Sequence, residues 1–220
     1  MKTVAKSLIT IALLSIVGYA QKPKVKTPPP KEQVKASVKK TPKAAFDKGI
    51  LSGKTYSNKT FNFEVTFPDN WMVPGNDFEA YMLKKGHDLR LKVPPTIKIL
   101  QTAYKFMPGT TDNAIVRIAV ENLNSNPQIK DAVDYFDVMR KSFKIAKTPA
   151  DFKYSETQAE RLGTKQFAFL DSSSSETGKK RIYATVKNGY AILFTLTYTN
   201  DADVETLRNI LSEGNFRLKK

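Results

Sequence analysis

An alternation of aromatic and polar residues, FNFEVTFPDNW at residues 61–71, constrains the fold more than any other stretch of the sequence. Successive side chains of a β-strand point to opposite faces, so the apolar residues of this stretch share one face: Phe61, Phe63, Val65 and Phe67. The Pro-Asp-Asn that follows cannot continue a sheet and favours a turn. The pattern predicts an opening strand with a buried aromatic face, and a turn that folds Trp71, the only tryptophan, back over the same core.

The middle of the chain changes from strand-like to helix-like periodicity. Four further strands are predicted, at Asp77–Lys84, Leu89–Val93, Thr96–Tyr104 and Ala114–Val120. In residues 126–146, apolar residues then recur every three or four positions, which predicts an amphipathic helix with Asn126 and Pro127 as its cap and first turn. Its buried stripe is expected to comprise Ile129, Val133, Phe136, Met139 or Arg140, and Phe143.

The last third of the chain predicts an antiparallel sheet followed by a helix. Residues 159–198 are expected to form three strands, with SSSSETG as the loop between the first two and Asn188-Gly189 as a two-residue turn between the last two. The last strand, Tyr190–Tyr198, is apolar on both faces, which is typical of a central strand covered on each side. Residues 200–214 begin with capping and acidic residues and end at Gly214, which predicts a helix that buries Val204, Leu207, Ile210 and Leu211.

Three segments in this order resemble the Mog1/PsbP-like superfamily: TYSNKTFNFEVTFPDNW, AIVRIAVENLNSNPQIKDAVDYFDVMRKSF and KNGYAILFTLTYTNDADVETLRNILSEGNF. The resemblance spans about Lys54 to Leu218. It implies an α+β fold, an α/β/α sandwich whose twisted, mainly antiparallel sheet is covered by helices. The family's shared roles are mostly non-enzymatic binding or accessory work. Its landmarks are packing residues, so no catalytic or binding residue can be transferred from them.

The first twenty residues are typical of a secretory signal peptide. Lys2 and Lys6 precede an apolar run from about Leu8 to Ala20, and small residues suit cleavage near Ala20. The run is short against the ~20 residues that a membrane-spanning helix needs. We therefore expect a periplasmic or extracellular protein, with an uncleaved membrane anchor as the alternative. The absence of cysteine from the sequence excludes a lipoprotein anchor, disulfides, thiolate metal sites and cysteine nucleophiles.

Residues 21–45 are rich in lysine and proline, and we expect them to form an extended, disordered arm before a globular domain at 46–220. Residues 1–45 hold ten lysines and one glutamate (+9), and the other 26 basic and 20 acidic residues contribute +6 to the net charge of +15. This distribution argues against a nucleic-acid partner. The arm is interpreted as a spacer, or alternatively as a tail for weak contact with anionic surfaces. Its lysines are Lys22, Lys24, Lys26, Lys31, Lys35, Lys39, Lys40 and Lys43.

Few residues are candidates for chemistry. His87, the only histidine, could act as a base or metal ligand beside Asp88, but the preceding glycine favours a hairpin tip. Asp131, Asp134 and Asp137 could bind Ca²⁺ from one helical stripe, although a solvated outer face is the favoured interpretation. The serine-rich loop lacks the Gly-x-Ser-x-Gly motif of hydrolases. Strand aromatics such as Phe167 and Tyr183 could stack bases or sugars, but a covered sheet would place them in the core.

No catalytic, cofactor-binding or metal-binding residue is therefore assigned from the sequence, and no cofactor is expected. The hypothesis is an exported, non-enzymatic binding or accessory protein of the cell envelope, acting through protein–protein or small-ligand contacts. The alternative is a basic-tailed protein that binds lipid, wall polymer or nucleic acid through its arm. An unrecognised hydrolase is the third hypothesis.

Overall fold

The computed structural model describes residues 47–75, 77–86, 93–108, 110, 112–146 and 148–217. The predicted signal peptide (1–20), the predicted arm (21–45) and His87 lie outside these residues, as does most of the strand predicted at 89–93. These features therefore stay predictions.

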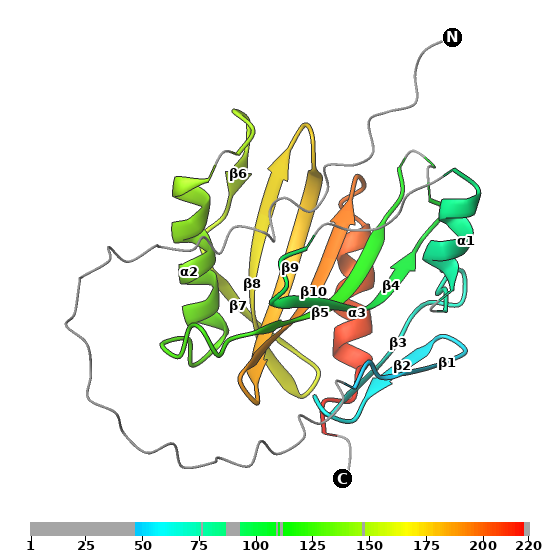
Figure 1. Ribbon diagram of the computed structural model, residues 1–220, viewed down its shortest axis with the longest axis horizontal. Coiled ribbons are helices and arrows are strands. Elements are labelled where there is room, and N and C mark those ends of the chain that lie inside the picture. The colour runs from blue at the N-terminus through cyan, green and yellow to red at the C-terminus, as the bar shows by residue number, and fades with distance from the viewer. Residues whose placement is uncertain are drawn as a thin grey trace, which may run out of the picture.

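The described chain forms two antiparallel sheets (Figure 1). The small sheet has the order β1-β2-β3, with bounds β1 (Ile50–Ser52), β2 (Thr55–Asn58) and β3 (Phe63–Thr66). The large sheet has the order β4-β5-β10-β9-β8-β6, and β7 also pairs with β8. Its strands are β4 (Ile97–Tyr104), β5 (Ile115–Asn122), β6 (Lys153–Tyr154), β7 (Gln158–Leu162), β8 (Lys165–Ser174), β9 (Gly178–Lys187) and β10 (Tyr190–Tyr198).

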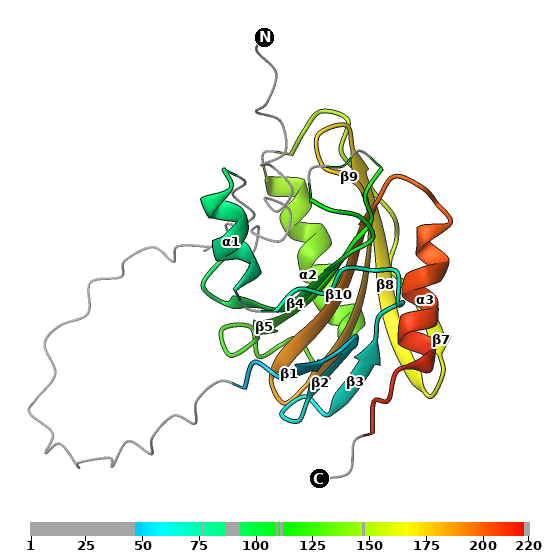
Figure 2. The same ribbon diagram turned by 90° about the vertical axis from the view of Figure 1, so that its right-hand side faces the viewer.

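Helices lie on both faces of the large sheet. The helices are α1 (Phe78–Lys84), α2 (Ala132–Ile145) and α3 (Asp203–Glu213). Figures 1 and 2 show α1 and α2 on one face, and α3 with the small sheet on the other. The expected α+β sandwich with an antiparallel sheet between helices is confirmed.

Two hydrophobic cores fill the space on either side of the large sheet. One joins the sheet to α3 and the small sheet, and the other joins it to α2. The central strand β10 contributes to both, with Phe194 in the first and Leu193 in the second, each fully buried. The prediction that residues 190–198 form a strand covered on each side is confirmed.

The apolar residues of the stretch 61–67 are buried as predicted, but its strand covers only Phe63–Thr66 and follows β1 and β2, and Phe61 lies in the preceding turn with Asn62 at a positive φ of 59°. The four apolar residues are no more than 2% exposed, and Trp71 is 3% exposed in the same core. Backbone hydrogen bonds between Glu64 and Asn215, of 2.8 and 2.9 Å, tie β3 to the segment that follows α3. The stretch is therefore part of the core and not the lip of an open cleft.

Two sequence predictions for the hairpins differ in outcome. Asn188 and Gly189 both have positive φ, 53° and 75°, as the predicted two-residue turn requires. However, residues 158–198 form four strands and not three, because Gly163 (φ 55°) closes an additional β7–β8 hairpin. The first serines of SSSSETG belong to β8, so the loop itself is shorter than predicted.

Two predictions for the helices were wrong. Residues predicted as the strand Asp77–Lys84 form α1, which buries Met82 and places Phe78 with its ring 6.0 Å from that of Tyr104. Helix α2 begins at Ala132 rather than at Pro127, because the Asp131 side chain accepts hydrogen bonds from the first turn. Val133 lies in the first turn of α2 and is 46% exposed, instead of lying in the buried stripe.

Candidate functional site

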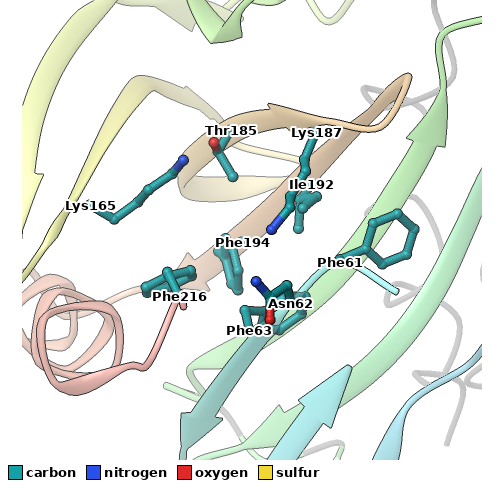
Figure 3. A pocket seen from close by; sticks show the side chains of 9 residues that line it. All are labelled: Phe61, Asn62, Phe63, Lys165, Thr185, Lys187, Ile192, Phe194 and Phe216. Carbon is teal, nitrogen blue, oxygen red and sulfur yellow. The ribbon is translucent and has the colours of Figure 1, made fainter. Parts of the chain in front are cut away.

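A small hollow opens on the α3 face of the large sheet, where β3 approaches β9 and β10 (Figure 3). Its volume of about 20 Å³ is room for one ordered water or one small polar group. The residues that line it are Phe61, Asn62, Phe63, Lys165, Thr185, Lys187, Ile192, Phe194 and Phe216. They come from β3 and the turn before it, from β8, β9 and β10, and from the segment after α3.

The floor of the hollow is aromatic and rigidly packed. The ring of Phe63 lies edge-on to that of Phe194 at 5.5 Å and is stacked on that of Phe216 at 6.2 Å. Phe216 also contacts the edge of Phe167 at 5.2 Å. Interlocked rings of this kind add specific geometry to their burial. The floor is therefore held in place by the core beneath it.

The rim is polar and carries two lysines. Lys165 and Lys187 are both half-buried, and Thr185 between them is buried. Figure 3 shows the ammonium group of Lys165 extending toward Thr185 and that of Lys187 toward Asn62. Two cations, a hydroxyl and an amide thus converge above an apolar floor.

The turn that carries Asn62 is fixed by hydrogen bonds on both sides. The Asn58 side chain accepts a 3.0 Å hydrogen bond from the backbone N–H of Phe61. Asn188, in the β9–β10 turn, donates from its side chain to the carbonyl oxygen of Thr60 at 3.2 Å. Asn62 itself has a positive φ of 59°, a conformation that asparagine tolerates better than most residues. The local sequence Asn-x-x-Phe-Asn therefore places one wall of the hollow.

This arrangement suits recognition of a negatively charged group. Half-buried ammonium groups attract an anion more strongly than fully solvated ones, since the surrounding protein lowers the dielectric response. The hydroxyl and amide can accept or donate hydrogen bonds to the bound group. The small volume limits the hollow to one end of a ligand, such as a carboxylate.

Beside the hollow, a chain of ion pairs links the strands under α3. The Glu160 carboxylate accepts hydrogen bonds from the Tyr183 hydroxyl at 2.5 Å and from Arg208 of α3 at 2.5 and 2.9 Å. Burial and the adjacent Glu160 raise the pKa of Tyr183, so it stays a neutral donor. One strand pair further, Arg181 binds Asp171 through two hydrogen bonds of 2.6 and 2.7 Å. Each charged group in this chain has a partner, so we interpret it as structural.

The acidic stripe on α2 has roles within the helix. Asp131 caps its N-terminus, accepting from the backbone N–H groups of Val133 and Asp134 at 2.8 and 3.0 Å. Asp134 accepts from the backbone of Lys130 at 2.8 Å, and Asp137 lies 3.7 Å from Arg140. Among the described residues, no group of three or more acidic or histidine side chains is placed to hold a metal ion. The favoured interpretation of a solvated face agrees with these positions.

The serine-rich loop and the strand aromatics, which were also candidates, have structural roles. In the serine-rich loop, Ser174 and Thr177 bond to each other at 2.8 Å, and Asp151 accepts from the backbone of Ser175 at 2.6 Å. The strand aromatics Phe167, Phe169, Tyr183 and Tyr198 are buried, as a covered sheet requires. They are core residues and cannot stack on a ligand.

The lysines of the hollow were not identified from the sequence. Lys165 and Lys187 lie at strand ends, where charged residues are common, and neither belongs to a motif. A signal was nevertheless present: each has the strand parity of buried aromatic neighbours, Phe167 for Lys165 and Tyr183 for Lys187. A cation on the covered face of a sheet is the pattern that could have marked the site.

Within the described part of the chain, none of the helices has the length and apolar composition needed to cross a bilayer.

Comparison with known proteins gives a likeness of fold. No protein-family model and no curated protein matches the sequence. Among solved structures, the chain is similar to PsbP (CyanoP) of the cyanobacterium Synechocystis sp. PCC 6803, with 14% identity and a TM-score of 0.46, over 79% of this chain and 98% of the other. It is also similar to a protein of Bacteroides thetaiotaomicron VPI-5482, with 12% identity and a TM-score of 0.39, over 77% of this chain and 50% of the other.

Proposed function

We propose that this protein is an exported, non-enzymatic binding or accessory protein of the cell envelope, which holds an acidic group of a partner protein or small ligand in the hollow beside β3. The observation that carries the proposal is the pair of half-buried lysines, Lys165 and Lys187, over a packed phenylalanine floor. Export is inferred from the sequence of residues 1–20, and the absence of catalysis from the lack of a catalytic motif in the sequence.

A binding role fits the physical character of the hollow. The aromatic floor belongs to the core, so the site is formed before a ligand arrives and loses little conformational entropy on binding. The lysines supply charge complementarity, which favours fast association and selection of acidic over neutral groups. Such a hollow provides one anchoring contact, and the remaining contacts would come from the surface around it.

The proposal is tested by titrating the full chain with N-acetylglutamate and, as a neutral match, N-acetylglutamine. Chemical shifts of the Asn62 and Thr185 amides are followed by nuclear magnetic resonance. We expect the acidic probe to shift these signals and the neutral probe to leave them in place. The double variant Lys165→Gln/Lys187→Gln should weaken binding at least tenfold, whereas Lys141→Gln on the exposed face of α2 should not change it.

Equal shifts from both probes, or binding retained by the double variant, would show that the hollow does not recognise acidic groups. Binding to natural partners is tested by capture from an envelope extract with the wild-type chain and the double variant as matched baits. Export is tested separately, by fractionating cells and determining the N-terminal residue of the protein recovered outside the cytoplasm. Recovery only in the cytoplasm, with Met1 present, would contradict it.

A further inference from the structure

The β9–β10 turn contains the only Asn-Gly dipeptide of the sequence, Asn188-Gly189. Both residues are exposed, and both have a positive φ, 53° and 75°. The backbone nitrogen that follows an asparagine can attack the side-chain amide, and glycine leaves this nitrogen unobstructed because it has no side chain. The turn is therefore the place in the chain where deamidation of an asparagine meets the least steric resistance.

The two reacting groups are lightly restrained. The backbone N–H of Gly189 makes no hydrogen bond within the described part of the chain. The Asn188 side chain makes one, from Nδ2 to the carbonyl oxygen of Thr60 at 3.2 Å, at an exposed position. A single solvent-exposed hydrogen bond is a weak restraint, because water replaces either partner when it opens. Its opening frees the Asn188 side chain to turn toward its own backbone.

We propose that Asn188 is a site of spontaneous deamidation, and that its conversion releases the wall of the hollow that carries Asn62. The Gly189 nitrogen attacks Cγ of Asn188 and forms a C–N bond, and the side-chain nitrogen leaves as ammonia with the proton that the Gly189 nitrogen gives up. Water then opens the cyclic imide at either carbonyl, which leaves aspartate or isoaspartate at position 188. Water is the only co-reactant, and nothing is oxidised or reduced.

Either product removes a contact that positions the hollow. A carboxylate has no N–H to donate to the Thr60 carbonyl oxygen, so the two oxygens repel each other. The Asp47 carboxylate already lies at this turn, where it accepts from the backbone N–H and the hydroxyl of Thr60 at 3.3 and 3.2 Å. A second negative charge here is therefore unfavourable. Isoaspartate also lengthens the backbone of the two-residue turn, which disturbs the pairing of Lys187 with Tyr190.

Conversion of Asn188 is measured by incubating the full chain in mildly alkaline buffer and analysing digests by tandem mass spectrometry. Asn124, which is exposed and followed by serine, is the matched asparagine in the same molecule. We expect Asn188 to convert about tenfold faster than Asn124 or more, with isoaspartate among the products. The variant Asn188→Gln should not convert at a comparable rate, because its longer side chain must close a larger ring. Conversion of Asn188 no faster than that of Asn124 would overturn the assignment.

The effect on the wall of the hollow is measured with Asn188→Asp, which carries the carboxylate of the product on a residue that tolerates positive φ. Asn188→Gly keeps the turn with neither donor nor charge, so it separates loss of the hydrogen bond from repulsion. The readout is hydrogen exchange of the Phe61 backbone N–H, which bonds to the Asn58 side chain at 3.0 Å in the same turn. We expect severalfold faster exchange in Asn188→Asp and an intermediate rate in Asn188→Gly. Unchanged exchange in Asn188→Asp would overturn the link to the hollow.

Deamidation needs only the Asn188-Gly189 turn, whereas its effect on ligand affinity rests on the function proposed for the hollow. N-acetylglutamate is therefore titrated into the wild type and Asn188→Asp. We expect severalfold weaker binding to the variant, because Asn62 is no longer fixed, and equal affinities would overturn this effect. A wild type that does not bind the probe would contradict the proposed function alone, since conversion and exchange are measured without a ligand.

Discussion

Trp71 is the largest side chain in the turn that follows β3. Because it is buried, we expect its truncation to destabilise the protein. It is 3% exposed and packs in the core between α3 and the small sheet. Truncation to alanine leaves a cavity that the surrounding rings cannot fill, so Trp71→Ala should lower the free energy of unfolding by ~3–5 kcal/mol. Urea denaturation measures the change. Tyr81→Ala on α1, where the tyrosine is 54% exposed, is the aromatic control and should change stability by under about 0.5 kcal/mol.

Glu121 makes the stability of the protein depend on pH. Its carboxyl is 2% exposed and accepts a 2.7 Å hydrogen bond from the Tyr135 hydroxyl of α2. Burial raises the pKa of Glu121 above its usual 4.5, so the folded state holds this proton more tightly than the unfolded state. The stabilisation is complete below pH 4.5 and is lost as pH rises through the folded-state pKa.

Glu121→Gln removes this titration while its amide oxygen can still accept from Tyr135. We therefore expect the variant to gain stability relative to the wild type as pH rises above 4.5. Urea denaturation at several pH values between about 4 and 8 measures the difference, with Glu213→Gln at the exposed end of α3 as the control. Parallel stability curves for wild type and Glu121→Gln would show that the carboxyl is not perturbed.

The turn of the β7–β8 hairpin lies close to the end of α3. Alanine substitutions at two hairpin glycines, one beside α3 and one in open space, measure how much that close approach contributes to stability. Gly163 and Gly53 both turn a hairpin with positive φ, 55° and 58°. A Cβ on Gly163 would lie 2.2 Å from the Ser212 carbonyl oxygen at the end of α3, whereas a Cβ on Gly53 would meet no atom within 4 Å. Both alanine variants should lose roughly 1–2 kcal/mol from backbone strain. Gly163→Ala should lose more, because the hairpin must also move away from α3.

Chemical denaturation of the two variants gives this comparison directly. Equal losses in the free energy of unfolding would mean that the end of α3 can move away from the added methyl group at little cost. A larger loss for Gly163→Ala, accompanied by faster hydrogen exchange in residues 203–213, would locate the disturbance in the helix.

Strands with long apolar faces could be predicted better than short strands and helix boundaries, since β1, β2, β6 and β7 were not predicted and the strand predicted at Asp77–Lys84 is α1. Strands β3, β4, β5 and β10 have continuous apolar faces, which period-two alternation reveals. Helix α1 has only seven residues, and within it only Met82 is buried, so its short pattern did not distinguish a helix from a strand. The start of α2 depends on one hydrogen-bonding side chain, Asp131, among several residues that could cap a helix.

The two-layer cover of the sheet was predictable, whereas the hollow on one of its faces was not. The double-sided apolar character of residues 190–198 required helices on both faces, and the structure confirms this. The hollow joins residues as distant as Asn62 and Phe216. Its composition follows from packing between distant segments, which periodicity within one segment does not contain.

The position of β10 in the large sheet has a consequence for how the chain is made. β10 lies between β5 and β9, which do not pair with each other, so it alone joins the two halves of the sheet. It is also the last strand of the sheet in chain order. A ribosome therefore releases residues 97–187 before the strand that unites them exists, and the growing chain cannot close its sheet until Tyr198 has been synthesised. Until then, the β4–β5 pair and the β8–β9 pair can form only as separate halves of the sheet.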